Sequence, residues 1–351
     1  MKRFSFFGYA LLMGIFMSCA SYRAKAPSVT VPRVPQEDFP GIPEYPPEIP
    51  AESAAQMIQR NPPSIKKYFT LDENGGITVR ADLALPGGET GEAENYRAVY
   101  DLKNLQAGEA GGFWVPFSLS SDETGEVQRD WLFWTPQEDG TGILLSFDDN
   151  YYREWEGIFD LLDNYGAKVT FFVQGAYNPF STEALKRGHD IGYHTLNHLE
   201  LPKVSRDVFA RETLSEVEIY RNAGVPLVSF AYPFGLSEQW MHGELFKKFK
   251  ILRGYGVTYR LYDPQAVRDG YIIAKSIDTF VYKRDEDFYE AADLMLKTVR
   301  FLGGNLILPL ATHTISDTAI WGISLRRLEY LLQRANDLGL RFYLYGDFAE
   351  E

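Results

Sequence analysis

From Thr141 to the C-terminus, short apolar runs alternate with segments of helical periodicity. The runs have the length and composition of buried strands, and the segments between them suit amphipathic helices. The predicted strands span residues 143–147, 168–173, 190–193, 228–232, 271–277, 306–311 and 341–345. Helices are predicted at 205–223, 285–302 and 324–338, and another from Trp155 to Leu162 that Gly166 would stop. This alternation predicts an α/β fold, a (β/α) barrel of about seven units.

One predicted strand ends in two adjacent carboxylates. The run 143–147 leads directly into Asp148 and Asp149, and barrel enzymes place their chemistry where the strands end. His194 and His198 follow another predicted strand, and they would share one face if this segment formed a helical turn. One carboxylate and two imidazoles suffice for a divalent metal with an open position. The second carboxylate is then free to move protons.

A third histidine, His313, follows the predicted strand 306–311. Taken singly, these features have ordinary explanations. Tandem acids after a strand usually form a turn, paired histidines arise on helices by chance, and His313 would serve as a core residue. Because all of them follow strands of one barrel-like domain, we expect them to converge at one rim.

The single cysteine, Cys19, lies at the end of a leader. A basic start at Lys2 and Arg3 precedes an apolar segment, residues 4–17, that is too short to span a membrane comfortably. Residues 16–19 (Phe-Met-Ser-Cys) resemble a bacterial lipoprotein box, which implies cleavage after residue 18 and lipid on the thiol of Cys19. The alternative is an ordinary signal peptide that is removed together with the cysteine. Both interpretations predict an exported protein.

Three further regions follow this leader, residues 1–18. Residues 19–66 form a predicted tether, because ten of the 19 prolines fall between Pro27 and Pro63 and favour extended chain. Residues 67–136 are predicted to form a small antiparallel β-rich domain of about four strands, since apolar and polar residues alternate there. Residues 137–351 form the barrel. The tryptophans of the β-rich region would make a sugar-stacking surface, or they would pack in a core or between domains; they are Trp114, Trp131 and Trp134.

Residues 141–348 resemble the NodB-homology polysaccharide deacetylases, carbohydrate esterase family 4. The family's first motif, usually Thr-Phe-Asp-Asp-Gly, corresponds to Ser-Phe-Asp-Asp-Asn at 146–150, and its second strand to Lys-Val-Thr-Phe-Phe-Val at 168–173. The second motif and its approach correspond to residues 188–198, which end in His-Thr-Leu-Asn-His. The third corresponds in part to Phe-Ala-Tyr-Pro-Phe-Gly at 230–235, and the last to Leu-Ala-Thr-His at 310–313.

The resemblance implies a divalent metal held by Asp149, His194 and His198. Zn²⁺ is the simplest choice, with Co²⁺, Mn²⁺ or Ni²⁺ as alternatives. It also implies that Asp148 is the general base on the attacking water, and that His313 protonates the departing sugar amine.

The third motif implies the remaining contacts. By family analogy, the backbone amide of Phe234 stabilises the oxyanion, within a substrate-binding segment that also contains Tyr232 and Pro233. Thr195 is expected to fix the histidine turn by hydrogen bonding. Tyr232 and Trp321 would either line the sugar groove or pack in the core.

The sequence departs from the family pattern at several positions. Ala231 stands where the third motif usually has an arginine that orients the base. Arg253 would replace it from another strand, or it is a surface arginine. Asp278 stands where an aspartate would tune the catalytic histidine. Asn150 replaces a glycine beside the metal and would alter the fit of the sugar.

The resemblance therefore implies a metal-dependent N-deacetylase of an acetylated amino-sugar polymer in the cell envelope or outside the cell. We expect the protein to be lipid-anchored to the bacterial envelope, with membrane contact through the lipid alone. The formal net charge of −13 argues against non-specific binding to nucleic acid. The alternatives are a non-catalytic glycan-binding lipoprotein with a degenerate deacetylase fold, and an O-acetyl esterase.

Overall fold

The computed structural model describes residues 69–71, 77–81, 96–107, 112–121, 127–134 and 140–349. The expected leader and tether, including Cys19, lie outside the described residues. No helix in the described part of the chain has the length and apolarity that crossing a membrane requires.

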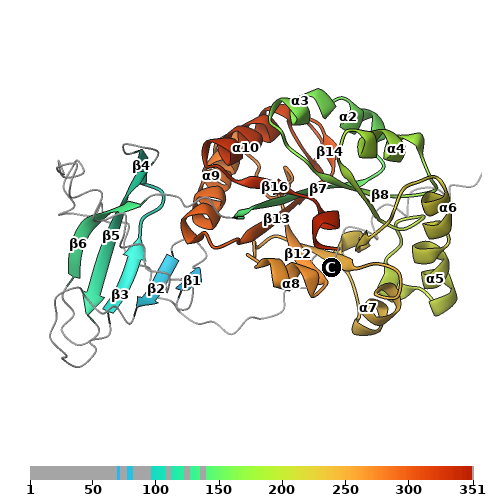
Figure 1. Ribbon diagram of the computed structural model, residues 1–351, viewed down its shortest axis with the longest axis horizontal. Coiled ribbons are helices and arrows are strands. Elements are labelled where there is room, and N and C mark those ends of the chain that lie inside the picture. The colour runs from blue at the N-terminus through green and yellow to red at the C-terminus, as the bar shows by residue number, and fades with distance from the viewer. Residues whose placement is uncertain are drawn as a thin grey trace, which may run out of the picture. The chain divides into compact units, whose positions relative to one another are not determined.

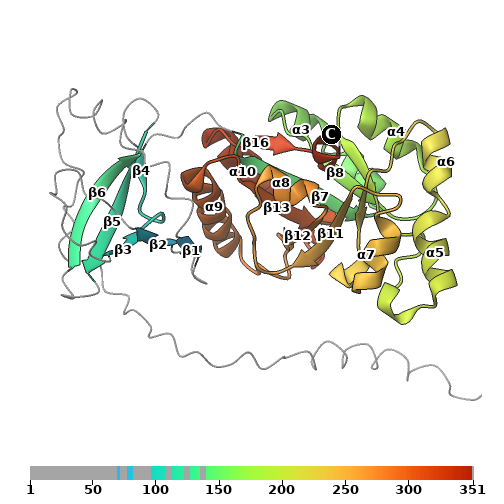
Figure 2. The same ribbon diagram turned by 60° about the horizontal axis from the view of Figure 1, so that its bottom comes forward.

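Seven parallel strands close into a barrel (Figure 1, Figure 2). They are β7 (Gly142–Asp149), β8 (Thr170–Val173), β9 (Asp190–Tyr193), β10 (Ser229–Ala231), β11 (Ile251–Gly256), β12 (Tyr271–Ser276) and β13 (Ile307–Thr312). The ring closes because β13 pairs with β7 along its length, from Ile307 opposite Gly142 to Thr312 opposite Phe147. The predicted barrel of about seven units is confirmed.

The identity of one strand differs from the prediction. The run 341–345 is not a member of the closed ring; β16 (Arg341–Tyr343) pairs beside the first three residues of β7. The ring instead contains β11, which the sequence pattern missed. Its sequence, Ile-Leu-Arg-Gly-Tyr-Gly, breaks the apolar run with a buried arginine and two glycines, so it does not look like a buried strand.

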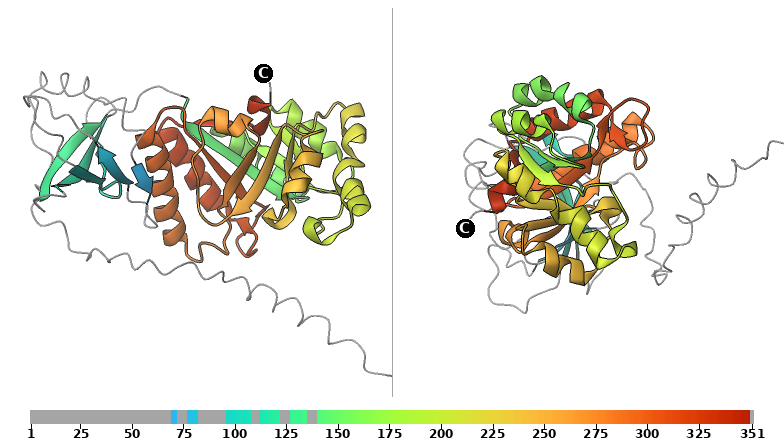
Figure 3. Two further views of the ribbon diagram at one scale, coloured as in Figure 1. Left: turned by 90° about the horizontal axis from the view of Figure 1, so that it is seen from below. Right: turned by 90° about the vertical axis from the view of Figure 1, so that its right-hand side faces the viewer.

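Helices cover the outside of the strands, as Figure 3 also shows. They are α2 (Tyr152–Glu156), α3 (Phe159–Asn164), α4 (Pro179–Lys186), α5 (Arg206–Leu214), α6 (Val217–Asn222), α7 (Gln239–Leu245), α8 (Pro264–Arg268), α9 (Asp285–Leu302) and α10 (Leu325–Asp337). The continuous helix predicted at 205–223 is wrong, because α5 ends before α6 begins. The Thr213 hydroxyl donates to the Phe209 carbonyl at 2.8 Å, a contact that bends and weakens a helix near its end.

Short elements complete the loops of the barrel. The 3₁₀ turns η3 (Leu201–Lys203) and η4 (Pro233–Gly235) follow β9 and β10, and η5 (Tyr345–Phe348) follows β16. A two-stranded ladder joins β14 (Thr314–Ile315) to β15 (Gly322–Ile323) after β13.

The earlier region is an antiparallel sheet, as predicted, but it has six described strands where about four were expected. It contains β1 (Phe69–Leu71), β2 (Ile77–Ala81), β3 (Tyr96–Tyr100), β4 (Gln106–Ala107), β5 (Phe113–Ser121) and β6 (Val127–Trp134). Of the three tryptophans named above, Trp131 is buried, and the side chain of Trp134 lies outside the described residues.

Candidate active site

Five polar side chains reach the C-terminal rim of the barrel through the alternation of the strands. A small apolar cluster inside the ring includes Leu144, Ile251, Ile272 and Ile307, and a Cβ at Gly192 would collide there with the ring of Phe172. Side chains two positions apart share a face of a strand. Steps of two therefore lead from Leu144 to Asp148, from Gly192 to His194, from Ile251 to Arg253, from Ile272 to Asp278, and from Ile307 to His313.

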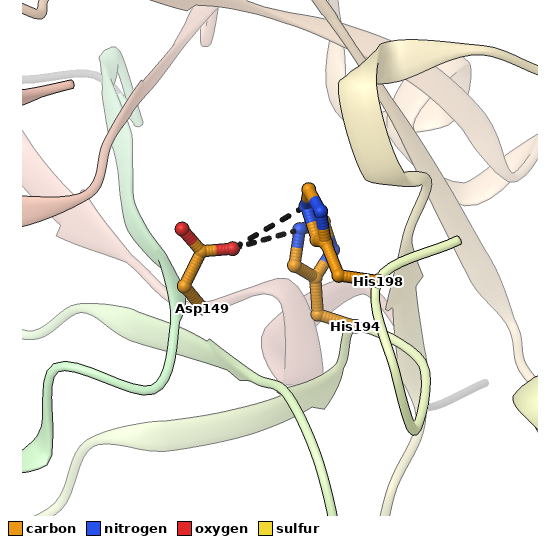
Figure 4. Close-up of side chains that lie close together, drawn as sticks. All are labelled: Asp149, His194 and His198. Atoms are coloured by element: carbon orange, nitrogen blue, oxygen red, sulfur yellow. Dashed lines mark ion pairs between the residues drawn. The ribbon is translucent and has the colours of Figure 1, made fainter. Parts of the chain in front are cut away.

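Asp149, His194 and His198 form a candidate metal site (Figure 4). The Oδ1 atom of Asp149 lies 3.5 Å from Nε2 of His194 and 3.4 Å from Nε2 of His198. Strict alternation would point Asp149 away from Asp148, but its φ of 88° breaks the strand geometry and its carboxylate reaches the two histidines. Oδ1 is buried without a hydrogen-bond donor among the described residues. Two imidazole nitrogens and this carboxylate oxygen are ligands that Zn²⁺ uses, so the site fits a metal.

The segment between the two histidines is a loop, so the helical turn that would have placed them on one face does not form. Thr195 and His198 have φ values of 69° and 55°, which a right-handed helix does not allow. Left-handed conformations of non-glycine residues cost about 1–3 kcal/mol each and persist where the surroundings hold them. The backbone N–H of His198 donates to the Thr195 hydroxyl at 3.0 Å. The imidazoles thus converge through a strained loop that Thr195 helps to hold.

His194 has the tautomer that a metal ligand needs. Its Nδ1 lies 2.9 Å from the Ala231 carbonyl oxygen, which can only accept, so Nδ1 carries the hydrogen and the lone pair is on Nε2. Burial lowers the pKa of His194 to about 4. The ring is therefore neutral near pH 7.

Asp148 and Arg253 form a buried ion pair beside the candidate metal site, with an Nη2 hydrogen of Arg253 donated to Oδ2 of Asp148. Burial alone would raise the pKa of Asp148, but the Arg253 guanidinium and the imidazoles of His194 and His313 lower it below 3.8. Arg253 lies directly opposite Ala231 in the register of β11 and β10. The arginine absent at position 231 is thus matched by one at the same level of the next strand.

His313 and Asp278 form a second pair, with 2.9 Å between Nδ1 of His313 and Oδ2 of Asp278. Thr312 donates to Oδ1 of Asp278 at 2.7 Å, and Ser276 and Tyr255 donate to Oδ2. Burial would lower the pKa of His313, but the hydrogen bond and charge of Asp278 raise it to about 9. The site therefore combines an ionised carboxylate, a protonated imidazole and a candidate metal site.

The Asp278→Asn variant should lose this raised pKa. Without the carboxylate, the pKa of His313 falls from about 9 toward or below its ordinary 6.5, because burial remains. We expect NMR titration of the His313 ring to report this fall, and the alkaline limb of the rate profile to move to lower pH. Thr312→Val, which removes one hydrogen bond to Asp278 and leaves His313 intact, should shift the pKa much less. An unchanged pKa in Asp278→Asn contradicts the pairing.

The structure separates the two aromatic candidates for the sugar groove. Tyr232 is fully buried, and its ring packs against Phe230 at 5.2 Å. The alternative in which Tyr232 lines the sugar groove is therefore wrong, because its side chain packs in the core. Trp321 is 47% exposed, and its ring lies 5.7 Å from that of His313, so it stays at the rim.

Phe234 also lies at the rim. It is 55% exposed, it has a φ of 59°, and its ring lies 4.6 Å from that of His198. Pro233, its neighbour, is buried.

Sequence reasoning missed two residues that support the catalytic candidates. Tyr255 contacts Asp278 and lies 5.6 Å from the His313 ring. Nε1 of Trp155 donates to the His313 carbonyl at 2.9 Å. Tyr255 was hidden because its strand was not recognised, while Trp155 was assigned only to a helix.

Comparisons with known proteins find relatives of the part of the chain that contains the tandem acids and the two histidines. Residues 136–245 match the family described as polysaccharide deacetylase. A peptidoglycan-N-acetylglucosamine deacetylase of Bacillus cereus is 42% identical over 62 residues, which are 16% of this chain and 29% of that protein. The match thus spans less than a third of the relative's length.

Two solved structures show similar but distant folds. A peptidoglycan deacetylase of Bacillus subtilis has a TM-score of 0.44 and 16% identity, covering 60% of this chain and 91% of the other. A family 4 carbohydrate esterase of Streptomyces lividans has a TM-score of 0.43 and 16% identity, covering 58% and 92%.

The family match includes β7, with the tandem acids, and both histidines of the candidate metal site. The closed ring of seven strands places these residues together with His313 at one rim. Over residues 136–245, which begin just before β7 and end with α7, the chain therefore matches the polysaccharide deacetylase family.

Proposed function

We propose that this protein is a metal-dependent deacetylase that hydrolyses N-acetyl groups of amino-sugar residues in a cell-envelope or extracellular polysaccharide. The observation that carries the proposal is the placement, around the candidate metal site, of a carboxylate paired with Arg253 and an imidazole paired with Asp278. The lowered pKa of Asp148 keeps it ionised and free to accept a proton, and the pKa of His313, raised to about 9, keeps it protonated and able to donate one. Amide hydrolysis needs both groups at neutral pH.

Each residue has one task in this reaction. A metal ion held by Asp149, His194 and His198 would supply Lewis-acid polarisation of the acetyl carbonyl. The oxygen of the attacking water bonds to the carbonyl carbon while Asp148 accepts one of the protons of that water. The Phe234 amide donates a hydrogen bond to the developing oxyanion. His313 then protonates the sugar nitrogen, the C–N bond breaks, and acetate and a free amine leave.

The direct test is acetate release from N-acetylglucosamine oligomers and from O-acetylated sugars. We expect release from the N-acetyl substrates, loss of release with a chelator, and recovery when metal is returned. Release from O-acetylated sugars alone would identify an esterase. Binding of oligomers without acetate release would identify a glycan-binding protein and refute the proposal.

We also propose that Cys19 carries a lipid that anchors the protein to the bacterial cell envelope. The support is the basic and apolar leader that ends at this cysteine. Metabolic labelling with a fatty-acid analogue should mark the wild-type chain and not Cys19→Ala. Equal labelling of the two chains overturns the anchor.

A further inference from the structure

Glu212, on α5, contacts the loop that joins the two candidate histidine ligands. Its Oε2 accepts a hydrogen bond from the backbone N–H of Asn197 at 2.8 Å, and its Oε1 accepts one from the Asn197 side-chain amide at 2.8 Å. Its carbonyl oxygen accepts the N–H of Leu196 at 2.9 Å. One residue therefore holds two consecutive residues of the loop through three hydrogen bonds.

The burial of Glu212 and the strain of the loop make these contacts consequential. Glu212 is 1% exposed, and a buried carboxylate needs hydrogen-bond donors to offset the loss of water. The loop supplies them at Asn197, the residue directly before His198. Thr195 and His198 on either side are left-handed, a conformation that persists only where the surroundings hold it. Glu212 supplies that hold from outside the loop.

We propose that Glu212 is a positioning residue of the metal site, which fixes the backbone before His198 and so sets the affinity of the site for metal. It acts through Asn197, the partner of both hydrogen bonds that its carboxylate accepts. This inference rests on the proposed function, because it assumes that the site holds a metal ion. Hydrogen-bonding partners beyond the ligands commonly contribute 10- to 100-fold to metal affinity.

The test uses metal affinity, measured by titrating Co²⁺ into the metal-stripped full chain and following its visible absorption. Glu212→Gln keeps the volume of the side chain but replaces one acceptor with a donor. We expect its affinity to fall about 10- to 100-fold and its absorption band to change as the geometry loosens. Asn197→Ala removes only the bond to Oε1 at an exposed position, so it should fold normally and lose less affinity.

Asp190→Asn is the matched control. Asp190 is a buried carboxylate at the opposite end of β9, and it accepts the N–H groups of Gly346 and Ile191 at 3.0 and 2.9 Å. Its loss should lower the melting temperature and leave the Co²⁺ affinity unchanged. Unchanged affinity in Glu212→Gln, or an equal loss in Asp190→Asn, overturns the positioning role.

Two other outcomes are also decisive. If Glu212→Gln does not fold, unchanged affinity in Asn197→Ala overturns the inference, and reduced affinity supports it. If the wild-type chain binds no Co²⁺, the proposed function fails together with this inference. If the inference fails and the proposed function holds, the wild-type chain binds metal and releases acetate, and the variants keep the wild-type affinity for metal.

Discussion

Replacement of Asp148 by asparagine is expected to lower the rate of acetate release about 100- to 10,000-fold. The amide cannot take a proton from the attacking water, whereas the wild-type carboxylate is held ionised by the Arg253 guanidinium and the protonated His313 ring. Bound metal should remain at the wild-type level, because the three candidate ligands are untouched. The measurements are kcat for acetate release and metal content by elemental analysis.

The same substitution has a cost in stability that must be measured beside it. The neutral amide would leave the Arg253 guanidinium buried without a counter-charge, and breaking a buried ion pair typically costs about 3–5 kcal/mol. The assay temperature must therefore lie below the lowered melting temperature of the variant. A folded, metal-loaded Asp148→Asn chain with wild-type kcat contradicts the assignment of the base.

Arg253→Ala is expected to have the second large effect, again about 3–5 kcal/mol of unfolding free energy. Burial, no longer opposed by the guanidinium, should raise the pKa of Asp148. The acid limb of the rate profile then moves to higher pH, because a smaller fraction of the base is ionised at a given pH. Urea unfolding and the pH dependence of acetate release measure the two effects.

A rescue experiment tests whether an arginine on the neighbouring strand can replace Arg253. Ala231 lies directly opposite Arg253 in adjacent parallel strands, so Ala231→Arg in the Arg253→Ala background fills the vacated space from the neighbouring strand. We expect it to restore part of both the stability and the acid limb. Ala231→Arg alone should destabilise the protein, because two guanidinium groups would then share one buried site. If the double variant folds but neither effect is restored, an arginine at position 231 cannot replace Arg253, and the two positions are not equivalent.

Alternation of apolar runs and helical segments was enough to predict the barrel, because most of its strands are short and strongly apolar. The prediction missed β11 because its polar and glycine residues serve the interior of the ring: Arg253 and Tyr255 contact Asp148 and Asp278. Hydrophobic patterning detects a buried strand by its apolar residues, so it misses a buried strand that contains charged ones.

The details of the site depended on backbone geometry and long-range contacts that local patterns do not contain. Two histidines four residues apart suggested a helical turn, but left-handed conformations at Thr195 and His198 make a loop instead. Tyr232 follows a barrel strand, as a groove residue would, but its side chain is buried in the core. Glu212 gave no signal, because its contact with Asn197 spans 15 residues and depends on how α5 packs.

The most direct test of the central claim is a metal titration of acetate release from an N-acetylglucosamine oligomer by the chelator-treated full chain. We predict almost no release from the stripped protein and full recovery at one metal ion per chain, with no recovery in His198→Ala. Undiminished release after chelation, or equal recovery in His198→Ala, would contradict a metal-dependent deacetylase built on Asp149, His194 and His198.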